Sequence, residues 1–224
     1  MSADSRKRVK RWNPAAWWAD RMHPAGQRES VEKLTFVVLD TETTGLDPER
    51  DRILSIGALR VHQGRIHVKE ALELYLQQEH FDSQSVPIHG ILREDAHHRV
   101  SEAEALRLLS EYIGDAEIVG HHIGFDRAIL QRGLSRQGLK PLRNACLDTG
   151  LLYQKTLLKT PLLRRKEFYS LDDLARRFDL ARTDRHTALG DAYLTAMALL
   201  HILGLLKAKG IQTRKQLLRA GRAG

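Results

Sequence analysis

Two acidic residues follow an apolar segment in the first quarter of the chain. Asp40 and Glu42 come directly after residues 34–39 (LTFVVL), whose length and β-rich composition predict a buried strand. Side chains two residues apart point to the same face of a strand, so the two carboxylates must lie close together. Like charges at this spacing resist joint ionisation unless a positive charge neutralises them. Hard cations such as Mg²⁺ and Mn²⁺ prefer oxygen ligands, so this pair is a candidate part of a metal site.

A third acidic candidate lies where a predicted strand passes into a helix. Asp126 follows residues 119–125 (VGHHIGF) at that point. Ligands of α/β sheets gather at the ends of strands, which favours a role in a site. Taken alone, Asp126 is also explained as a helix acid that interacts favourably with the helix dipole.

A histidine and a further aspartate are found near the end of the chain. His186 and Asp191 are five residues apart, and in one helix their side chains would point about 140° apart. We therefore expect His186 on the loop before a helix and Asp191 in its first turns. Residues 188–200 are mostly small and apolar, so the Asp191 carboxylate is expected to face something other than bulk water. A surface loop histidine is the alternative interpretation of His186 alone.

Three motifs that contain these residues resemble those of a known family. DTETTGL at 40–46, HHIGFD at 121–126 and HTALGD at 186–191 are similar, in this order, to the three motifs of the DnaQ-like DEDDh 3′–5′ exonucleases. That family includes bacterial proofreading subunits, ribonuclease T and oligoribonuclease. The resemblance covers about residues 34–204 and implies a ribonuclease H-like fold, dependence on Mg²⁺ or Mn²⁺, and release of nucleoside 5′-monophosphates.

The resemblance also implies a role for each residue of the motifs. Asp40, Glu42 and Asp191 would hold the cation that carries the attacking water. Asp40 would also bind a second cation together with Asp126, and His186 would accept the proton of the water. An imidazole suits this role because its ordinary pKa is about 6.5.

Candidate substrate-binding residues surround these motifs. The chain departs from the family at position 122, where a histidine replaces the usual asparagine, so the positioning of Asp126 has to be achieved differently. Basic residues within 159–185 and after 205 would contact phosphates. The residues expected to contact the 3′-terminal nucleotide are Thr43, Thr44, Leu46, His89 and Phe125.

The remaining sequence predicts a mixed α/β sheet flanked by helices. Ser101 and Glu104 form a capping-box pattern at the start of one of the helices. The predicted strands cover residues 34–41, 52–62, 66–76 and 116–120, the first three as a meander. The predicted helices cover residues 101–113, 125–136, 148–158, 170–178 and 187–203.

Composition divides the chain into three parts. Residues 1–33 are expected to form a basic extension that contains all three tryptophans, and residues 205–224 a basic tail. Residues 34–204, between them, would form the exonuclease domain that the resemblance implies. Three tryptophans within seven residues favour docking of the extension on the domain or on a partner. The single cysteine, Cys146, excludes an internal disulfide and fits a cytoplasmic protein. We see neither a secretory signal nor a membrane span.

The net charge of +8 favours an anionic partner, nucleic acid before a membrane surface. We expect a 3′–5′ exonuclease that acts on single-stranded DNA in proofreading or repair, with a DNA polymerase or repair protein as a possible partner. An exoribonuclease that trims RNA 3′ ends is the alternative within enzymes. A non-catalytic nucleic-acid-binding polymerase accessory is the alternative from a different class.

Overall fold

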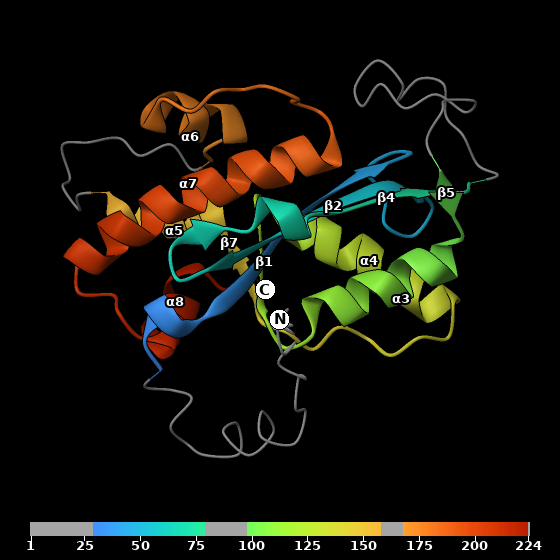
Figure 1. The fold of residues 1–224 in the computed structure, drawn as a ribbon, viewed down its shortest axis with the longest axis horizontal. Helices are drawn as coiled ribbons and strands as arrows, with labels where there is room; N and C mark the ends of the chain where they lie inside the picture. Colours follow the sequence, from blue (N-terminus) through green and yellow to red (C-terminus); the bar gives the residue numbers. More distant parts are fainter. Residues whose placement is uncertain (1–28, 79–97, 158–167, 224) are drawn as a thin grey trace, which may run out of the picture.

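A mixed sheet lies at the centre of the fold, with helices on both faces (Figure 1). The computed structural model describes residues 29–78, 98–157 and 168–223. The strands are β1 (Thr35–Thr43), β2 (Ile53–His62), β3 (Arg65–Ile66), β4 (Leu72–Leu76), β5 (Arg99–Val100), β6 (Glu117–Gly120) and β7 (Cys146–Asp148). The helices are α3 (Glu102–Ile113), α4 (Gly124–Arg136), α5 (Thr149–Thr156), α6 (Leu171–Phe178), α7 (Ala188–Ala208) and α8 (Arg214–Gly221), with two 3₁₀ helices, η2 (Val31–Lys33) and η3 (Val68–Glu70). This architecture confirms the predicted fold class.

β1 occupies a central position in the strand order β5-β4-β2-β1-β6-β7, with β3 paired to β2. It pairs antiparallel with β2 and parallel with β6, and β6 in turn pairs parallel with β7. The carboxyl ends of three neighbouring parallel strands therefore meet at one edge of the sheet, where ligands of α/β folds bind. Asp40 and Glu42 lie at the end of β1, so the topology places the acidic pair at this edge.

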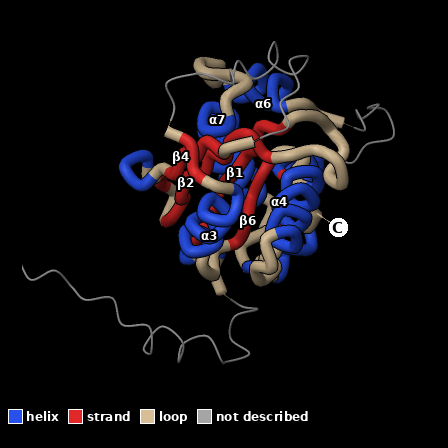
Figure 2. Tube along the Cα trace, turned by 90° about the vertical axis from the view of Figure 1, so that its right-hand side faces the viewer, coloured by secondary structure: helices blue, strands red, loops and turns tan. Residues whose placement is uncertain are grey.

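The side chains of β1 alternate between two separate hydrophobic cores. Val37 and Leu39 pack in the core that contains residues of α3 and α4. Phe36 and Val38 pack in the opposite core, which contains residues of α5 and α7. Because successive strand residues face opposite sides, the same alternation directs Asp40 and Glu42 toward α7 and Thr41 toward α4. Figure 2 shows α7 and α3 on opposite sides of the sheet.

α7 is the central helix of the second core. Ten of its residues are buried, and it contacts β1, β2, α5 and α6. By length and composition it could cross a membrane, but half of its most apolar stretch is buried inside the domain. A helix that is apolar around most of its circumference is expected in the core of a folded domain, and we assign α7 to that class.

Close approach of α7 to the sheet depends on Gly57 of β2. This glycine is paired with Asp40 across the β1–β2 ladder. A Cβ atom at position 57 would lie 2.2 Å from the backbone nitrogen of Leu189 and 2.3 Å from the carbonyl carbon of Ala188. The first turn of α7 can therefore approach Asp40 only because residue 57 has no side chain.

Three details of the predicted secondary structure need correction. The strand expected over 66–76 is interrupted by η3 and is divided into β3 and β4, both of which pair antiparallel with β2. The short strands β5 and β7 were not predicted, because two or three residues carry too little periodicity to be distinguished from a loop. The helix expected from 148 begins at Thr149, since Asp148 ends β7 and caps α5.

The C-terminal segment packs on the domain over most of its described length, unlike the tail expected over 205–224. α7 continues to Ala208, and α8 contacts α5 and β7 with Leu217 buried in the second core. Thr213 pairs with Ser30 as an isolated β-bridge, so the segment also contacts residues just before the sheet. The interpretation as a tail rested on the basic residues of the segment and overlooked its few apolar residues, which pack inward. The three tryptophans of the predicted N-terminal extension lie outside the described residues.

We expect Gly57→Ala to destabilise the protein by about 1–3 kcal/mol, because backbone atoms of α7 cannot move aside as a side chain would. The matched control is Gly204→Ala in α7, where no atom lies within 4 Å of the added Cβ. That change should be neutral or stabilising by up to about 1 kcal/mol, owing to the helix propensity of alanine. Urea unfolding measures both, and equal stabilities for the two variants would contradict the proposed close approach.

Candidate active site

Three carboxylates converge where β1 meets the first turn of α7. Asp40, Glu42 and Asp191 each place an oxygen within 4.8 Å of an oxygen of the other two. The first two come from β1 by the strand alternation described above, and the third comes from α7, whose approach Gly57 permits. Asp191 is buried, as expected from the small and apolar residues around it in the sequence.

The fourth acidic residue reaches β1 from the opposite face. Asp126 lies in the first turn of α4 and is buried. One of its carboxylate oxygens accepts hydrogen bonds from the Thr41 backbone nitrogen at 3.0 Å and from the Thr41 hydroxyl at 2.7 Å. Thr41 lies between Asp40 and Glu42 but points to the other face. The end of β1 therefore lies close to Asp191 on one face and contacts Asp126 on the other.

Burial and mutual repulsion disfavour ionisation of this cluster. Burial, with the charges of Asp126, Asp191 and Glu42, holds the pKa of Asp40 well above its ordinary value. Burial, with the charges of Asp191 and Asp126, raises the pKa of Glu42 to about 8. Burial also raises the pKa of Asp126 to about 7, although the hydrogen bonds from Thr41 oppose this. A positive charge among these oxygens would favour the ionised carboxylates and so counteract these shifts.

A buried aspartate fixes the loop that leads to Asp126. Asp148, at the end of β7, accepts hydrogen bonds from the backbone nitrogens of Ile123 and Leu151, at 3.1 and 3.0 Å. It therefore joins the start of α4 to the start of α5. His122 in this loop has a left-handed backbone with φ of 57°, a conformation that asparagine and histidine adopt more readily than most residues. The histidine thus satisfies the backbone requirement at the position where the chain departs from the family motif.

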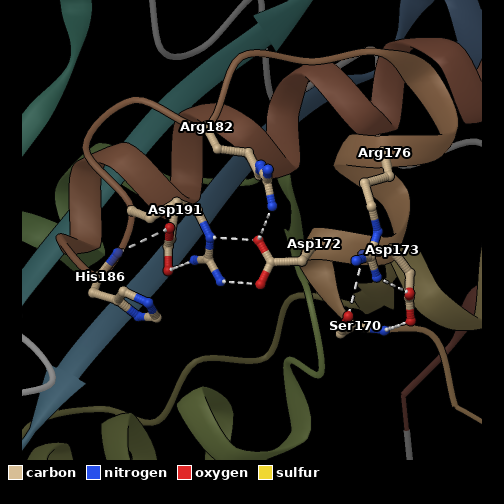
Figure 3. A network of polar contacts seen from close by, with 8 residues as sticks. Ser170, Asp172, Asp173, Arg176, Arg182, His186 and Asp191 are labelled. Carbon is tan, nitrogen blue, oxygen red and sulfur yellow. Dashed lines mark hydrogen bonds and ion pairs between the residues drawn. The ribbon is translucent and has the colours of Figure 1, made fainter.

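His186 lies at the edge of the carboxylate cluster, on the loop before α7, as predicted. Its side chain is exposed, and its backbone nitrogen donates to an Asp191 oxygen at 3.4 Å. Its φ of 65° is left-handed, as is that of Asp184 two residues earlier. Thr187 then caps α7 by accepting a hydrogen bond from Gly190 at 3.1 Å. Figure 3 shows the imidazole on the same side of the helix start as the Asp191 carboxylate.

An arginine also contacts the cluster. Arg185 forms an ion pair with Asp191 through Nη1. Its Nε donates to Asp172 of α6 at 3.2 Å. The predicted basic segment over 159–185 was expected to contact phosphates, whereas its last residue is paired within the protein. Residues 159–167 of that segment lie outside the described part of the chain.

The candidate substrate-binding residues differ in what the structure leaves exposed. Leu46 is 86% exposed beside the end of β1, so its side chain is free to contact a ligand. The hydroxyl of Thr43 donates to the Gly45 carbonyl, and that of Thr44 donates to Asp51. Phe125 is partly buried and packs against the first core. His89 lies outside the described residues.

Thr41 and Asp148 were not identified as parts of the site from the sequence, and Arg185 was expected only to contact phosphates. Thr41 carried a usable signal, because strand alternation turns its side chain away from its acidic neighbours and toward the helix of Asp126. The roles of Asp148 and Arg185 depend on contacts between segments that are distant in the chain. No local pattern indicates such contacts.

The donor set fits a hard divalent cation. Every member of the converging trio offers carboxylate oxygen, the ligand type that Mg²⁺ and Mn²⁺ prefer. Asp126 has one oxygen engaged by Thr41, which leaves its second oxygen for another contact. The trio is therefore the stronger candidate for direct cation binding.

Comparison with protein families assigns most of this fold to one group. Residues 37–199 match the family described as exonuclease, of the RNase T type. The chain is 36% identical over 187 residues to a DNA polymerase III subunit epsilon-like protein of Rhodobacter capsulatus, a match that covers 82% of this chain and 26% of that protein. It is 35% identical over 182 residues to a PolC-type DNA polymerase III of Thermotoga petrophila, covering 81% of this chain and 13% of that protein. The chain thus spans about a quarter or less of the length of these relatives.

Solved structures share the fold at lower identity. The crystal structure of E. coli exonuclease I in complex with a dT13 oligonucleotide has a TM-score of 0.67 and 18% identity, over 80% of this chain and 43% of that one. Exonuclease X in complex with 5′-overhanging duplex DNA has a TM-score of 0.61 and 21% identity, over 83% of this chain and 99% of that one. These similarities confirm the ribonuclease H-like exonuclease fold.

The raised pKa values of Glu42 and Asp126 predict a pH dependence of stability when cations are removed with EDTA. The folded protein retains protons that the unfolded chain releases above about pH 4–5, so stability should fall as pH rises to about pH 8. Thermal unfolding measured across this range tests the sign. Mn²⁺ should raise Tm more at about pH 8 than at about pH 6, because fewer protons compete for the oxygens.

Glu42→Gln is the matched variant for this experiment, because it keeps the shape of the side chain and cannot ionise. It should flatten the fall in stability with pH and weaken the effect of Mn²⁺. A cation-free stability that rises steadily over the same range would contradict the shifts.

Proposed function

Since the chain belongs to the RNase T exonuclease family and is therefore an exonuclease, we propose that it removes nucleotides from the 3′ end of single-stranded DNA. It would release nucleoside 5′-monophosphates in proofreading or repair and would depend on Mg²⁺ or Mn²⁺. The observation that carries this proposal is the convergence of Asp40, Glu42 and Asp191 beside His186, at the strand edge of a fold of this family.

The carboxylates would serve as the ligands of the catalytic cations. Asp40, Glu42 and Asp191 would hold one cation directly, and Asp40 with Asp126 would contribute to a second. Divalent cations at such a site would activate water and stabilise the charge that develops on the attacking and leaving oxygens. Thr41 supports this arrangement because its two hydrogen bonds keep the Asp126 carboxylate in one orientation.

His186 would accept the proton of the attacking water. Its ring is exposed at the edge of the cluster, and its backbone is hydrogen-bonded to the Asp191 carboxylate. The proton acceptor is thus connected through its backbone to one of the proposed cation ligands. A base on a loop can approach a bound substrate without rearrangement of the sheet.

The preference for DNA is supported by the proteins that share this sequence and this fold. The relatives named above are DNA polymerase III proteins, and solved neighbours contain DNA oligonucleotides. The net charge of +8 favours binding of a polyanion but does not distinguish DNA from RNA. Leu46, exposed in the segment that follows β1, would contact the terminal nucleotide.

Association with a DNA polymerase or a repair protein is a further part of the proposal, because the relatives named above are DNA polymerase III proteins. The tryptophan-bearing segment 12–18 is the proposed docking element, because aromatic side chains supply much of the energy of protein interfaces. If deletion of residues 1–28 left every interaction unchanged, this segment would not be the docking element.

Substitutions of Asp40 and His186 should lower the exonuclease activity by amounts that reflect their proposed roles. We expect Asp40→Ala to lower kcat/KM by about 10³-fold or more, because it removes a ligand shared by both cations. His186→Ala should cost roughly 10²-fold, the usual contribution of a general base. His201→Ala, an exposed histidine at the far end of α7, is the control and should retain wild-type turnover. Wild-type turnover of His186→Ala would contradict its role as the base.

Side-by-side digestion of 3′-unprotected DNA and RNA decides the substrate class. Labelled oligonucleotides of the same sequence, with Mg²⁺, should be shortened from the 3′ end, DNA faster than RNA, and EDTA should stop the reaction. Faster digestion of RNA would favour the exoribonuclease alternative. Failure to shorten either polymer would favour the non-catalytic accessory.

A further inference from the structure

One positive side chain lies against the carboxylate cluster and is held there from two helices. The Arg185 guanidinium forms an ion pair with an Asp191 oxygen through Nη1. Its Nε and Nη2 donate to the two oxygens of Asp172 at 3.2 and 3.5 Å. Figure 3 shows Asp172 and Asp191 facing each other from α6 and α7, with these contacts between them. The arginine therefore bridges a member of the cluster and a carboxylate outside it.

This bridge is shielded from solvent on the side of the cluster. The side chain of Arg185 is 18% exposed and that of Asp191 is 11% exposed, whereas Asp172 is 41% exposed. Ion pairs screened from water interact more strongly than exposed pairs. The contact with Asp191 is therefore the stronger electrostatic element, and the contact with Asp172 lies toward the surface.

Both oxygens of Asp191 already have partners within the protein. Oδ2 pairs with Arg185, and Oδ1 accepts a hydrogen bond from the His186 backbone at 3.4 Å. Asp191 is also one of the three carboxylates that converge within 4.8 Å. A divalent cation and the guanidinium thus require the same carboxylate, and two positive charges at one carboxylate repel each other.

We propose that Arg185 is a built-in counter-ion of the cluster that competes with the divalent cation for Asp191. Asp172 is its positioning residue and retains the guanidinium at the rim of the site when the cation binds. The inference rests on the proposed cation site and adds a residue that sets its affinity. Competition of this kind is reciprocal, so the cation weakens the Arg185–Asp191 pair as much as the pair weakens cation binding.

The geometry of arginine suits such a retained position. Its planar fork engages a carboxylate through two nitrogens, so contact with Asp172 survives the loss of Nη1 from Asp191. Arg182 also approaches Asp172, at 4.0 Å, but its side chain is 53% exposed. Arg182 thus supplies a control with the same charge and a common partner.

Mn²⁺ titration by calorimetry, without nucleic acid, tests the proposal on the full chain. Arg185→Gln should lower the Kd for Mn²⁺ by roughly tenfold, within the usual range of coupling between two sites. Arg182→Gln should leave it within about twofold. In EDTA, Arg185→Gln should also lower Tm more than Arg182→Gln, and Mn²⁺ should restore most of the loss.

Asp172→Asn distinguishes positioning from a merely structural role. It should lower the Kd for Mn²⁺ less than Arg185→Gln does, and its effect should vanish in the double variant, because Asp172 acts only through Arg185. If Asp172 and Arg185 only joined α6 to α7, these variants would lower Tm with no change in Kd, which would overturn the proposal. Should Arg185→Gln not fold, Arg185→Lys replaces it, since lysine lacks the fork and should give an intermediate Kd.

Three further results of the Mn²⁺ titration would support or overturn the proposal. Equal Kd values for wild type and Arg185→Gln overturn the counter-ion role but leave the cation site intact. Absence of Mn²⁺ binding in every variant overturns the cation site, and with it this inference. Binding only when Arg185 is replaced supports strong competition.

Discussion

Concentration of negative charge at the end of one buried strand is the constraint around which this domain is organised. Burial raises the pKa values of Asp40, Glu42 and Asp126, and neighbouring carboxylates add to the cost of ionising Asp40 and Glu42. The fold offsets this cost in parts: hydrogen-bond donors from Thr41 face Asp126, and a guanidinium faces Asp191. A divalent cation would complete the compensation, and the site is built of the oxygen ligands that such a cation selects.

The alternation of β1 lets its end contact one carboxylate from a helix on each face of the sheet, Asp191 of α7 and Asp126 of α4. Residues 40 and 42 face α7 while residue 41 faces α4, so one strand end collects side chains from both layers of the domain. Each layer needs its own support. On one side, Gly57 lets the backbone of α7 approach β2, and on the other, Asp148 fixes the loop before α4. A change at either support is expected to move one half of the cluster relative to the other.

Much of this arrangement is predictable from local sequence. The apolar run before Asp40, the helix with Asp191 in its first turn and the loop position of His186 all follow from periodicity and spacing, and the structure places them accordingly. Predictions failed where packing overrides local pattern. The basic composition after residue 204 indicated a tail, yet Leu217 is buried, because a few apolar residues on one face suffice to dock a short helix.

The sequence by itself determined the chemistry of this protein: the acidic residues, the histidine, their order along the chain and the family to which they belong. These properties are local, since strand alternation and helix spacing act over a few residues. Only the tertiary structure decided which groups contact the carboxylates of the site and hold its segments in place. The bonds of Thr41 with Asp126, of Asp148 with Ile123 and of Arg185 with Asp172 join segments separated by 85, 25 and 13 residues. Contacts over such separations depend on how the layers pack, which no local pattern records.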